Sequence, residues 1–277
     1  MSATLVIIVI LAVVVLLVFL FGHWWRSHRK HPATVQRKAR KWWSHTGLHW
    51  SPPAYLTVQL LVSLGATIAG LALFALLGDA VSDQAAITRL DLSVDNTLHS
   101  HAGSAGVAIA KGVSFVGGPT AMAALMMFGA IYLLVRREKL LLYGWLVAFI
   151  GGGALDWGLK TIFRRNRPSF PDPFVHVLGY SFPSGHSMGS LIGYGMLAYV
   201  VAHSVRRRGI DLVAAACAGV LVLAIGFSRL YLGAHYLSDV LAGFAAGLAW
   251  LTANVIALEA SAPRPAARGG DNADVAP

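Results

Sequence analysis

Three short polar segments stand out from an otherwise apolar sequence, because each contains residues that bind anions or transfer protons. They read KTIFRRNRP at 160–168, PSGH at 183–186 and SRLYLGAHYLSD at 228–239. Lysine and arginine neutralise negative charge, while histidine and aspartate move protons or hold a nucleophile in place. In combination, these residue types are suited to the transfer of a phosphoryl group.

The cationic residues of these segments predict a site for phosphate. The planar guanidinium of arginine contacts two phosphate oxygens at once, and lysine adds a compact charge. Ser184 and Gly185 immediately precede an apolar helix, so their backbone N–H groups should lie at its positive end, where glycine allows close approach. The predicted phosphate-binding residues are Lys160, Arg167, Ser184, Gly185 and Arg229.

His235 and Asp239 are four residues apart at the start of the last apolar run. On a helix this spacing places both on one face, where the carboxylate can keep one imidazole nitrogen protonated and leave the other free to attack. His186 adjoins the predicted phosphate site and could act as the general acid. The three predicted catalytic residues require no metal and no other cofactor. On the competing interpretation, His235 is an interfacial histidine and His186 caps a helix.

The pattern K-x6-RP, PSGH, SR-x5-H-x3-D resembles the signature of the type 2 phosphatidic acid phosphatase superfamily, and every position is filled. The resemblance implies a helical bundle with a six-span core over about residues 55–258. It assigns the phosphate to the five residues named above, the acid role to His186, the nucleophile role to His235 and its orientation to Asp239.

The same resemblance implies a metal-independent lipid phosphatase or diphosphatase acting through a phosphohistidine. The outward-facing bacterial members suggest undecaprenyl diphosphate as the substrate, with phosphatidylglycerophosphate and phosphatidic acid as rivals. A lipid transporter or inactive scaffold of the same fold is the alternative from another class. The charged residues argue against a transporter, because they cluster near one membrane boundary instead of following a path across it.

Three charged residues in or near the first motif allow more than one role. Arg164 and Arg165 could bind an anionic headgroup or a second phosphate, or they could carry solvated loop charge. Asp156 lies four residues before Lys160 inside a predicted span. That spacing favours an ion pair that positions the lysine over direct catalysis.

The composition indicates a membrane protein, since 56% of the 277 residues are hydrophobic and only 12% are charged. A helical span needs roughly 20 mostly apolar residues. We predict an all-α, multi-span transmembrane helical bundle, with a six-helix phosphatase core and one extra N-terminal span. The predicted spans are about 3–22, 55–78, 116–135, 140–159, 186–204, 211–228 and 239–258, with a possible short interfacial helix within 103–118.

The predicted spans divide the chain into three parts. Residues 1–54 hold the extra span and a basic cytoplasmic linker, residues 55–259 form the phosphatase domain, and residues 260–277 are a polar tail that we expect to be disordered.

Basic residues also predict the orientation in the cell (inner) membrane. Clusters of lysine and arginine follow the first, third, fifth and seventh spans, which places the C-terminus in the cytoplasm and the N-terminus outside. Loops 160–185 and 229–238 are basic although they lie on the outer, periplasmic side. We therefore predict the active site there, beside the lipid headgroups.

The formal net charge of +10 does not indicate nucleic acid, because no binding motif accompanies it. The predicted partners are the bilayer and a membrane lipid phosphate, and the oligomeric state stays open.

Overall fold

The computed structural model describes residues 52–83, 86–205 and 209–261, and this part of the chain is helical without strands. It contains six helical stretches that are long and apolar enough to cross a membrane. The prediction of an all-α transmembrane bundle is confirmed. The first predicted span, most of the basic linker and nearly all of the predicted tail lie outside the described residues.

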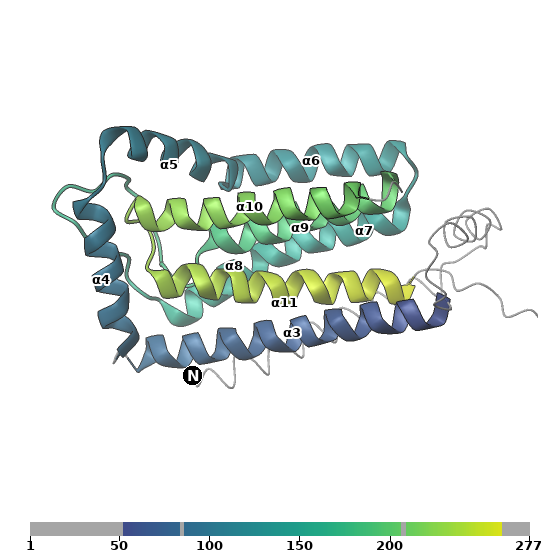
Figure 1. Ribbon diagram of the computed structural model, residues 1–277, viewed down its shortest axis with the longest axis horizontal. Helices are drawn as coiled ribbons and strands as arrows, with labels where there is room; N and C mark the ends of the chain where they lie inside the picture. Colours follow the sequence, from purple (N-terminus) through teal and green to yellow (C-terminus); the bar gives the residue numbers. More distant parts are fainter. Residues whose placement is uncertain (1–51, 84–85, 206–208, 262–277) are drawn as a thin grey trace, which may run out of the picture.

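The helices follow one another with short connections, except for the longer loop between α8 and α9 (Figure 1). Helices α5 and α6 together make one candidate span, and α7, η1 and α8 make another. The elements are α3 (Pro52–Ser82), α4 (Ala86–Ser100), α5 (Ser104–Val116), α6 (Pro119–Val135), α7 (Lys139–Leu146), the π-helical turn η1 (Val147–Gly151), α8 (Gly152–Phe163), α9 (Gly185–Val205), α10 (Ile210–Tyr231) and α11 (Leu237–Ser261).

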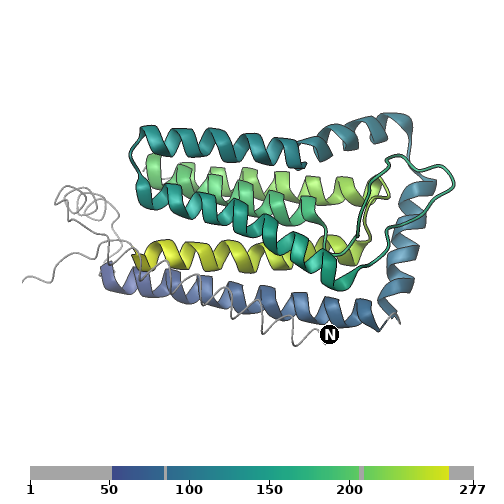
Figure 2. The same cartoon turned by 180° about the vertical axis from the view of Figure 1, so that it is seen from behind.

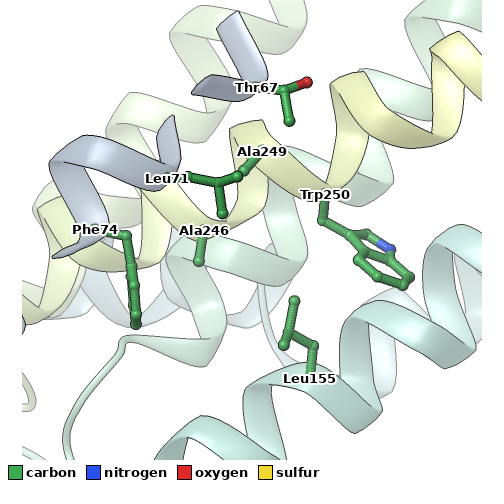
Figure 3. Close-up of a pocket in the computed structure, with 7 residues that line it drawn as sticks. All are labelled: Thr67, Leu71, Phe74, Leu155, Ala246, Ala249 and Trp250. Atoms are coloured by element: carbon green, nitrogen blue, oxygen red, sulfur yellow. The ribbon is translucent and has the colours of Figure 1, made fainter. Parts of the chain in front are cut away.

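Helix α11 is the most buried of the candidate spans and packs along α3. Small side chains permit this, since a Cβ added to Gly70 of α3 would lie 2.7 Å from the carbonyl oxygen of Ala245. Figure 3 shows the contact from the side, with α3 residues against the alanines of α11 and Trp250 directed toward α8. The labelled residues are Thr67, Leu71, Phe74, Leu155, Ala246, Ala249 and Trp250.

Helix α4 is absent from the sequence-based prediction and lies across one end of the bundle, as both views show (Figures 1 and 2). It is amphipathic, in contrast to the apolar spans. Its inner face carries two aspartates, Asp91 and Asp95, that are 1% and 5% exposed. A buried carboxylate requires partners, and those of Asp91 are described with the site.

The short helix considered possible within 103–118 is observed as α5, which ends at the Gly117–Gly118 junction before α6. The up-and-down topology brings the C-termini of α8 and α10 and the N-termini of α5, α9 and α11 toward the end of the bundle that α4 covers (Figure 1). All three polar segments of the sequence lie at this end.

Candidate active site

The three motifs, far apart in sequence, contribute to one cavity of about 370 Å³. Its charged end is lined by Lys160 and Arg167 from the first motif, Gly185 and His186 from the second, and His235 from the third. The structure therefore brings these five predicted residues together around one cavity. Three other predicted site residues, Ser184, Arg229 and Asp239, are buried behind this surface.

His235 lies in the turn before α11 and is only 2% exposed. Its Nε2 lies 2.9 Å from Nη1 of Arg167. Arginine can only donate, so Nε2 must be the unprotonated acceptor and Nδ1 must carry the hydrogen. Nδ1 lies 3.5 Å from Oδ2 of Asp239, within ion-pair range but long for a hydrogen bond. The network therefore leaves Nε2 as the unprotonated nitrogen of His235, a residue that lines the cavity.

Burial lowers the pKa of His235 to about 4. The carboxylate of Asp239 opposes this shift, whereas the positive charges of Arg167 and Arg229 add to it. A neutral imidazole retains the lone pair that a nucleophile needs. The surroundings thus keep the imidazole of His235 neutral at neutral pH.

Arg167 donates hydrogen bonds to three backbone carbonyl groups, which hold its side chain in place. Its Nε donates to the oxygen of Gly179 at 2.9 Å, Nη2 donates to Tyr180 at 3.0 Å, and Nη1 donates to Ala234 at 2.8 Å. Two of these acceptors belong to the α8–α9 loop, which therefore folds around the arginine that it carries. These three hydrogen bonds fix the guanidinium on the cavity wall, next to His235.

Lys160 and Asp156 form an ion pair, with Nζ 3.3 Å from Oδ1, as their spacing predicted. The lysine also donates to the carbonyl oxygen of Pro183, so it links α8 to the second motif. Gly185 is required beside this pair, because a Cβ there would lie 2.8 Å from Oδ2 of Asp156. Close packing against Asp156 is thus a reason for this glycine that the sequence did not reveal.

Ser184 does not present its N–H group to the cavity, and the prediction of a backbone contact from this residue is wrong in this structure. Its N–H donates to the carbonyl oxygen of Asp239 at 2.9 Å. Its hydroxyl accepts from the hydroxyl of Ser187 at 3.1 Å. Ser184 therefore joins the start of α9 to α11. Gly185 and His186, the first residues of α9, still lie where helical N–H groups have no intrahelical acceptor.

Arg229 is 4% exposed and donates from Nη1 to the hydroxyl of Ser114 in α5. Its Nε is buried and has no hydrogen-bond partner within the described chain. The guanidinium thus keeps an unused donor behind the cavity surface, consistent with an anion-binding role. The sequence did not predict Ser114, because a serine in a mostly apolar helix gave no signal.

His186 begins α9 and is partly buried on the cavity wall. The Gly117–Gly118 junction faces it, and a Cβ on Gly118 would lie 3.5 Å from its Nε2. His186 and His235 therefore line one cavity from two different helices. Both histidines can therefore contact a molecule bound in this cavity.

Neither sequence-based interpretation of Arg165 fits the structure. Its side chain is 13% exposed and bridges two buried carboxylates. Nη1 donates to Oδ1 of Asp239 at 2.6 Å, and Nη2 donates to Oδ2 of Asp91 at 2.7 Å. Arg164 is exposed, as expected for loop charge. Asp91 was not predicted, although two aspartates four residues apart on the amphipathic segment were a usable signal.

Comparison with known proteins agrees with this geometry. Residues 140–261 match the model of the PAP2 superfamily. Phosphatidylglycerophosphatase B of Bacillus subtilis is 42% identical over 95 residues, which cover 32% of this chain and 44% of the relative. Decaprenylphosphoryl-5-phosphoribose phosphatase of Mycobacterium tuberculosis is 34% identical over 129 residues, which cover 44% of this chain and 63% of the relative. The chain thus spans less than two thirds of either relative.

The fold has a counterpart among solved structures. The crystal structure of the first transmembrane PAP2 type phosphatidylglycerolphosphate phosphatase from Bacillus subtilis matches with a TM-score of 0.62 at 27% identity, over 67% of this chain and 92% of that one. Its membrane fold agrees with the bundle described above. Residues 140–261 of this chain are therefore similar to the PAP2 superfamily, and the described part of the chain has the apolar helices of a multi-pass membrane protein.

Proposed function

We propose that this protein is a lipid phosphatase that transfers the phosphate of a membrane lipid first to His235 and then to water. The residues that line the cavity carry the proposal. One end is lined by the cationic and histidine residues, whereas the remainder runs between α6, η1, α8 and α9 along Met122, Phe149 and Ile192. A molecule with a phosphate head and an apolar tail fits both parts.

In the first step, Nε2 of His235 attacks phosphorus in line with the bond to the lipid oxygen. A P–N bond forms while the P–O bond to the lipid breaks, and His186 gives a proton to the departing oxygen. Lys160, Arg167 and Arg229 neutralise the charge that spreads over the other phosphate oxygens. Asp239 stabilises the hydrogen on Nδ1 while the ring becomes positive.

In the second step, a water molecule attacks the phosphohistidine from the opposite side. His186, now neutral, takes a proton from this water, the P–N bond breaks, and inorganic phosphate leaves with the electron pair returned to Nε2. The cycle restores both histidines. Each role in it belongs to a residue of this chain, so we expect activity without a metal ion.

The identity of the lipid is a further part of the proposal. The sequence placed undecaprenyl diphosphate first, whereas the relatives bear names that specify phosphatidylglycerophosphate and decaprenylphosphoryl-5-phosphoribose. We therefore place phosphatidylglycerophosphate ahead of undecaprenyl diphosphate and phosphatidic acid. A panel of these lipids, assayed for phosphate release by the purified protein, ranks them by kcat/KM.

We also propose that the active site faces the outer, periplasmic side. The opposite end of the bundle carries Arg136, Arg137 and Lys139 in the α6–α7 turn, which favours a cytoplasmic location for that end. A single cysteine introduced by Asp172→Cys in a Cys217→Ser background should react with a membrane-impermeant maleimide in intact cells. Labelling only after membrane disruption would reverse the orientation.

The function is tested by comparing wild type with His235→Ala on each lipid of the panel. Phosphate release by wild type and its loss in the variant support the proposal. Turnover by the variant at the wild-type rate would rule out His235 as the nucleophile, and the absence of turnover by wild type on every lipid phosphate would rule out the function.

A further inference from the structure

The α4 helix lies outside the residues that match the PAP2 superfamily but contributes a buried carboxylate to the network behind the proposed nucleophile. Asp91 is 1% exposed. It accepts from the N–H of Ser238 at 2.9 Å, from the hydroxyl of Ser238 and from Nη2 of Arg165. Both carboxylate oxygens of Asp91 therefore accept hydrogen bonds. Asp91 is not among the residues that line the cavity.

Arg165 connects Asp91 to the catalytic carboxylate. Its two terminal nitrogens contact Asp91 and Asp239 separately, and its guanidinium carbon lies 4.3 Å from the ring centroid of Tyr236. A guanidinium in this position has little freedom, because burial, two ion pairs and the aromatic ring all restrict it. Oδ1 of Asp239 is thereby fixed, which leaves Oδ2 directed toward His235.

We propose that Asp91 and Arg165 are positioning residues that set the charge felt by His235, through a chain of contacts running Asp91–Arg165–Asp239–His235. This inference rests on the proposed role of His235 as nucleophile. Without Asp91, the positive charge of Arg165 would be balanced by Asp239 alone. Without Arg165, two buried carboxylates would remain with less compensation.

The two ends of this chain have opposite electrostatic effects on the imidazole. Removal of the Asp91 charge makes protonation of His235 less favourable, whereas removal of the Arg165 charge makes it more favourable. A purely structural role gives another result, because loosening the site admits water and moves His235 toward its ordinary pKa after either substitution. The direction of the shift after Asp91→Asn, downward for the electrostatic role and upward for a purely structural one, therefore separates the two explanations.

Other charged groups near His235 must stay constant in such a comparison. Arg167 of the α8–α9 loop and Arg229 of α10 interact with it directly. Lys160 and Asp156 of α8 and His186 of α9 line the same cavity, and Asp95 of α4 interacts with Asp239, the partner of His235. The pKa of Asp95 is raised to about 7 by burial and by the neighbouring charges of Asp91 and Asp239. Asp95 is thus neutral before His235 titrates near pH 4.

The experiment measures His235 directly, by imidazole NMR titration of the full-length protein, and in parallel records the acid limb of kcat/KM. We expect Asp91→Asn to move the His235 midpoint down and Arg165→Gln to move it up, each by on the order of one pH unit. Because neither residue touches the substrate, kcat should fall by about tenfold with little change in KM. Asp79→Asn and Arg89→Gln, which alter exposed charges on α3 and α4, are the controls.

The double variant Asp91→Asn/Arg165→Gln gives a second test and leaves no unpaired member of the Asp91–Arg165 pair. We expect the His235 midpoint of the double variant to return toward the wild-type value. Gel filtration and thermal unfolding show whether each variant folds, and the double variant replaces Asp91→Asn if that variant does not. Movement of all three variants toward 6.5, or no movement in any, would overturn the proposal. The NMR titration does not depend on turnover, so loss of the proposed function would be seen separately.

Discussion

The two ends of the cavity are built in opposite ways. At the charged end, Arg167 is held by three carbonyl groups and contacts His235. At the apolar end, Gly153 and Gly189 leave open space, because a Cβ on Gly153 would meet nothing within 4 Å and one on Gly189 would only touch Met122 at 4.0 Å. The comparison indicates that the residues proposed for the chemistry are held in fixed positions, whereas the apolar part of the cavity leaves space for the proposed lipid tail.

This difference predicts two classes of variant. Changes at the charged end should reduce the turnover of every phosphate substrate, long or short. Changes at the apolar end should affect only substrates with long tails. A water-soluble, short-chain lipid phosphate and a long-chain one therefore form the substrate pair for the predictions that follow.

The largest effect is expected for His235→Ala, which removes the nucleophile. We expect kcat to fall by at least about 10³-fold on both substrates, since loss of a covalent nucleophile leaves only binding and charge stabilisation. Phosphate-release assays with each substrate measure this fall in kcat. A loss confined to the long-chain substrate would show that His235 contributes to tail binding instead.

Arg167→Lys should come next, with a loss of about 10²-fold on both substrates. Lysine retains the charge but cannot reproduce the separate contacts to Gly179, Tyr180 and Ala234, and it loses bidentate phosphate binding. The exposed Arg89→Lys is the matched control. Equal kinetics for Arg167→Lys and wild type would mean that charge alone matters at this position.

The pH dependence tests the electrostatics of the charged end. The folded pKa of His235, about 4, lies below its ordinary value of 6.5, so the nucleophilic form persists as the pH falls from 7 to about 5. We expect the acid limb of kcat/KM near pH 4, with about a tenfold loss per pH unit below it. A limb near 6.5 would contradict the desolvated, arginine-flanked environment described here.

Much of the charged end could be predicted from sequence, because its chemistry requires specific residue types at fixed spacings. Lys160, Arg167, His186, His235 and Asp239 come together as expected. Ser184 differs, because its N–H is used to join α9 to α11, an inter-helix contact that spacing along one chain segment does not reveal.

The supporting helices were less accessible to prediction. Helix α4 is amphipathic and therefore lacks the apolar run by which spans are recognised. The sequence therefore predicted neither this helix nor the role of Asp91. Ser114 is a serine in a mostly apolar helix. The partners of Arg165 and Arg229 lie 74 and 115 residues away along the chain. Such contacts depend on the tertiary arrangement, which local patterns do not specify.

At the apolar end, Gly153→Leu should block the tail. We expect kcat/KM for the long-chain substrate to fall by about tenfold, the size of effect that a few misplaced methylene groups produce, with the short-chain substrate unchanged. Gly65→Leu, at an exposed and equally open glycine of α3, is the matched control. Equal losses on both substrates would mean that this part of the cavity does not hold the tail.

The smallest effect is expected from a chelator. Because histidines and cationic side chains supply every proposed role, excess EDTA should leave phosphate release within about twofold of the untreated rate. Metal-depleted buffers and added Mg²⁺ serve as the two controls. Strict dependence on added metal would refute the proposed division of roles.

The central claim is that the phosphate passes through His235, and trapping that intermediate tests it most directly. Wild type mixed with lipid labelled in its phosphate should be quenched within milliseconds in alkali, where phosphohistidine survives, and then digested for peptide mapping. The account predicts label on His235 in wild type and none in His235→Ala. Label on another residue, or product formation with no labelled protein at any quench time, would contradict it.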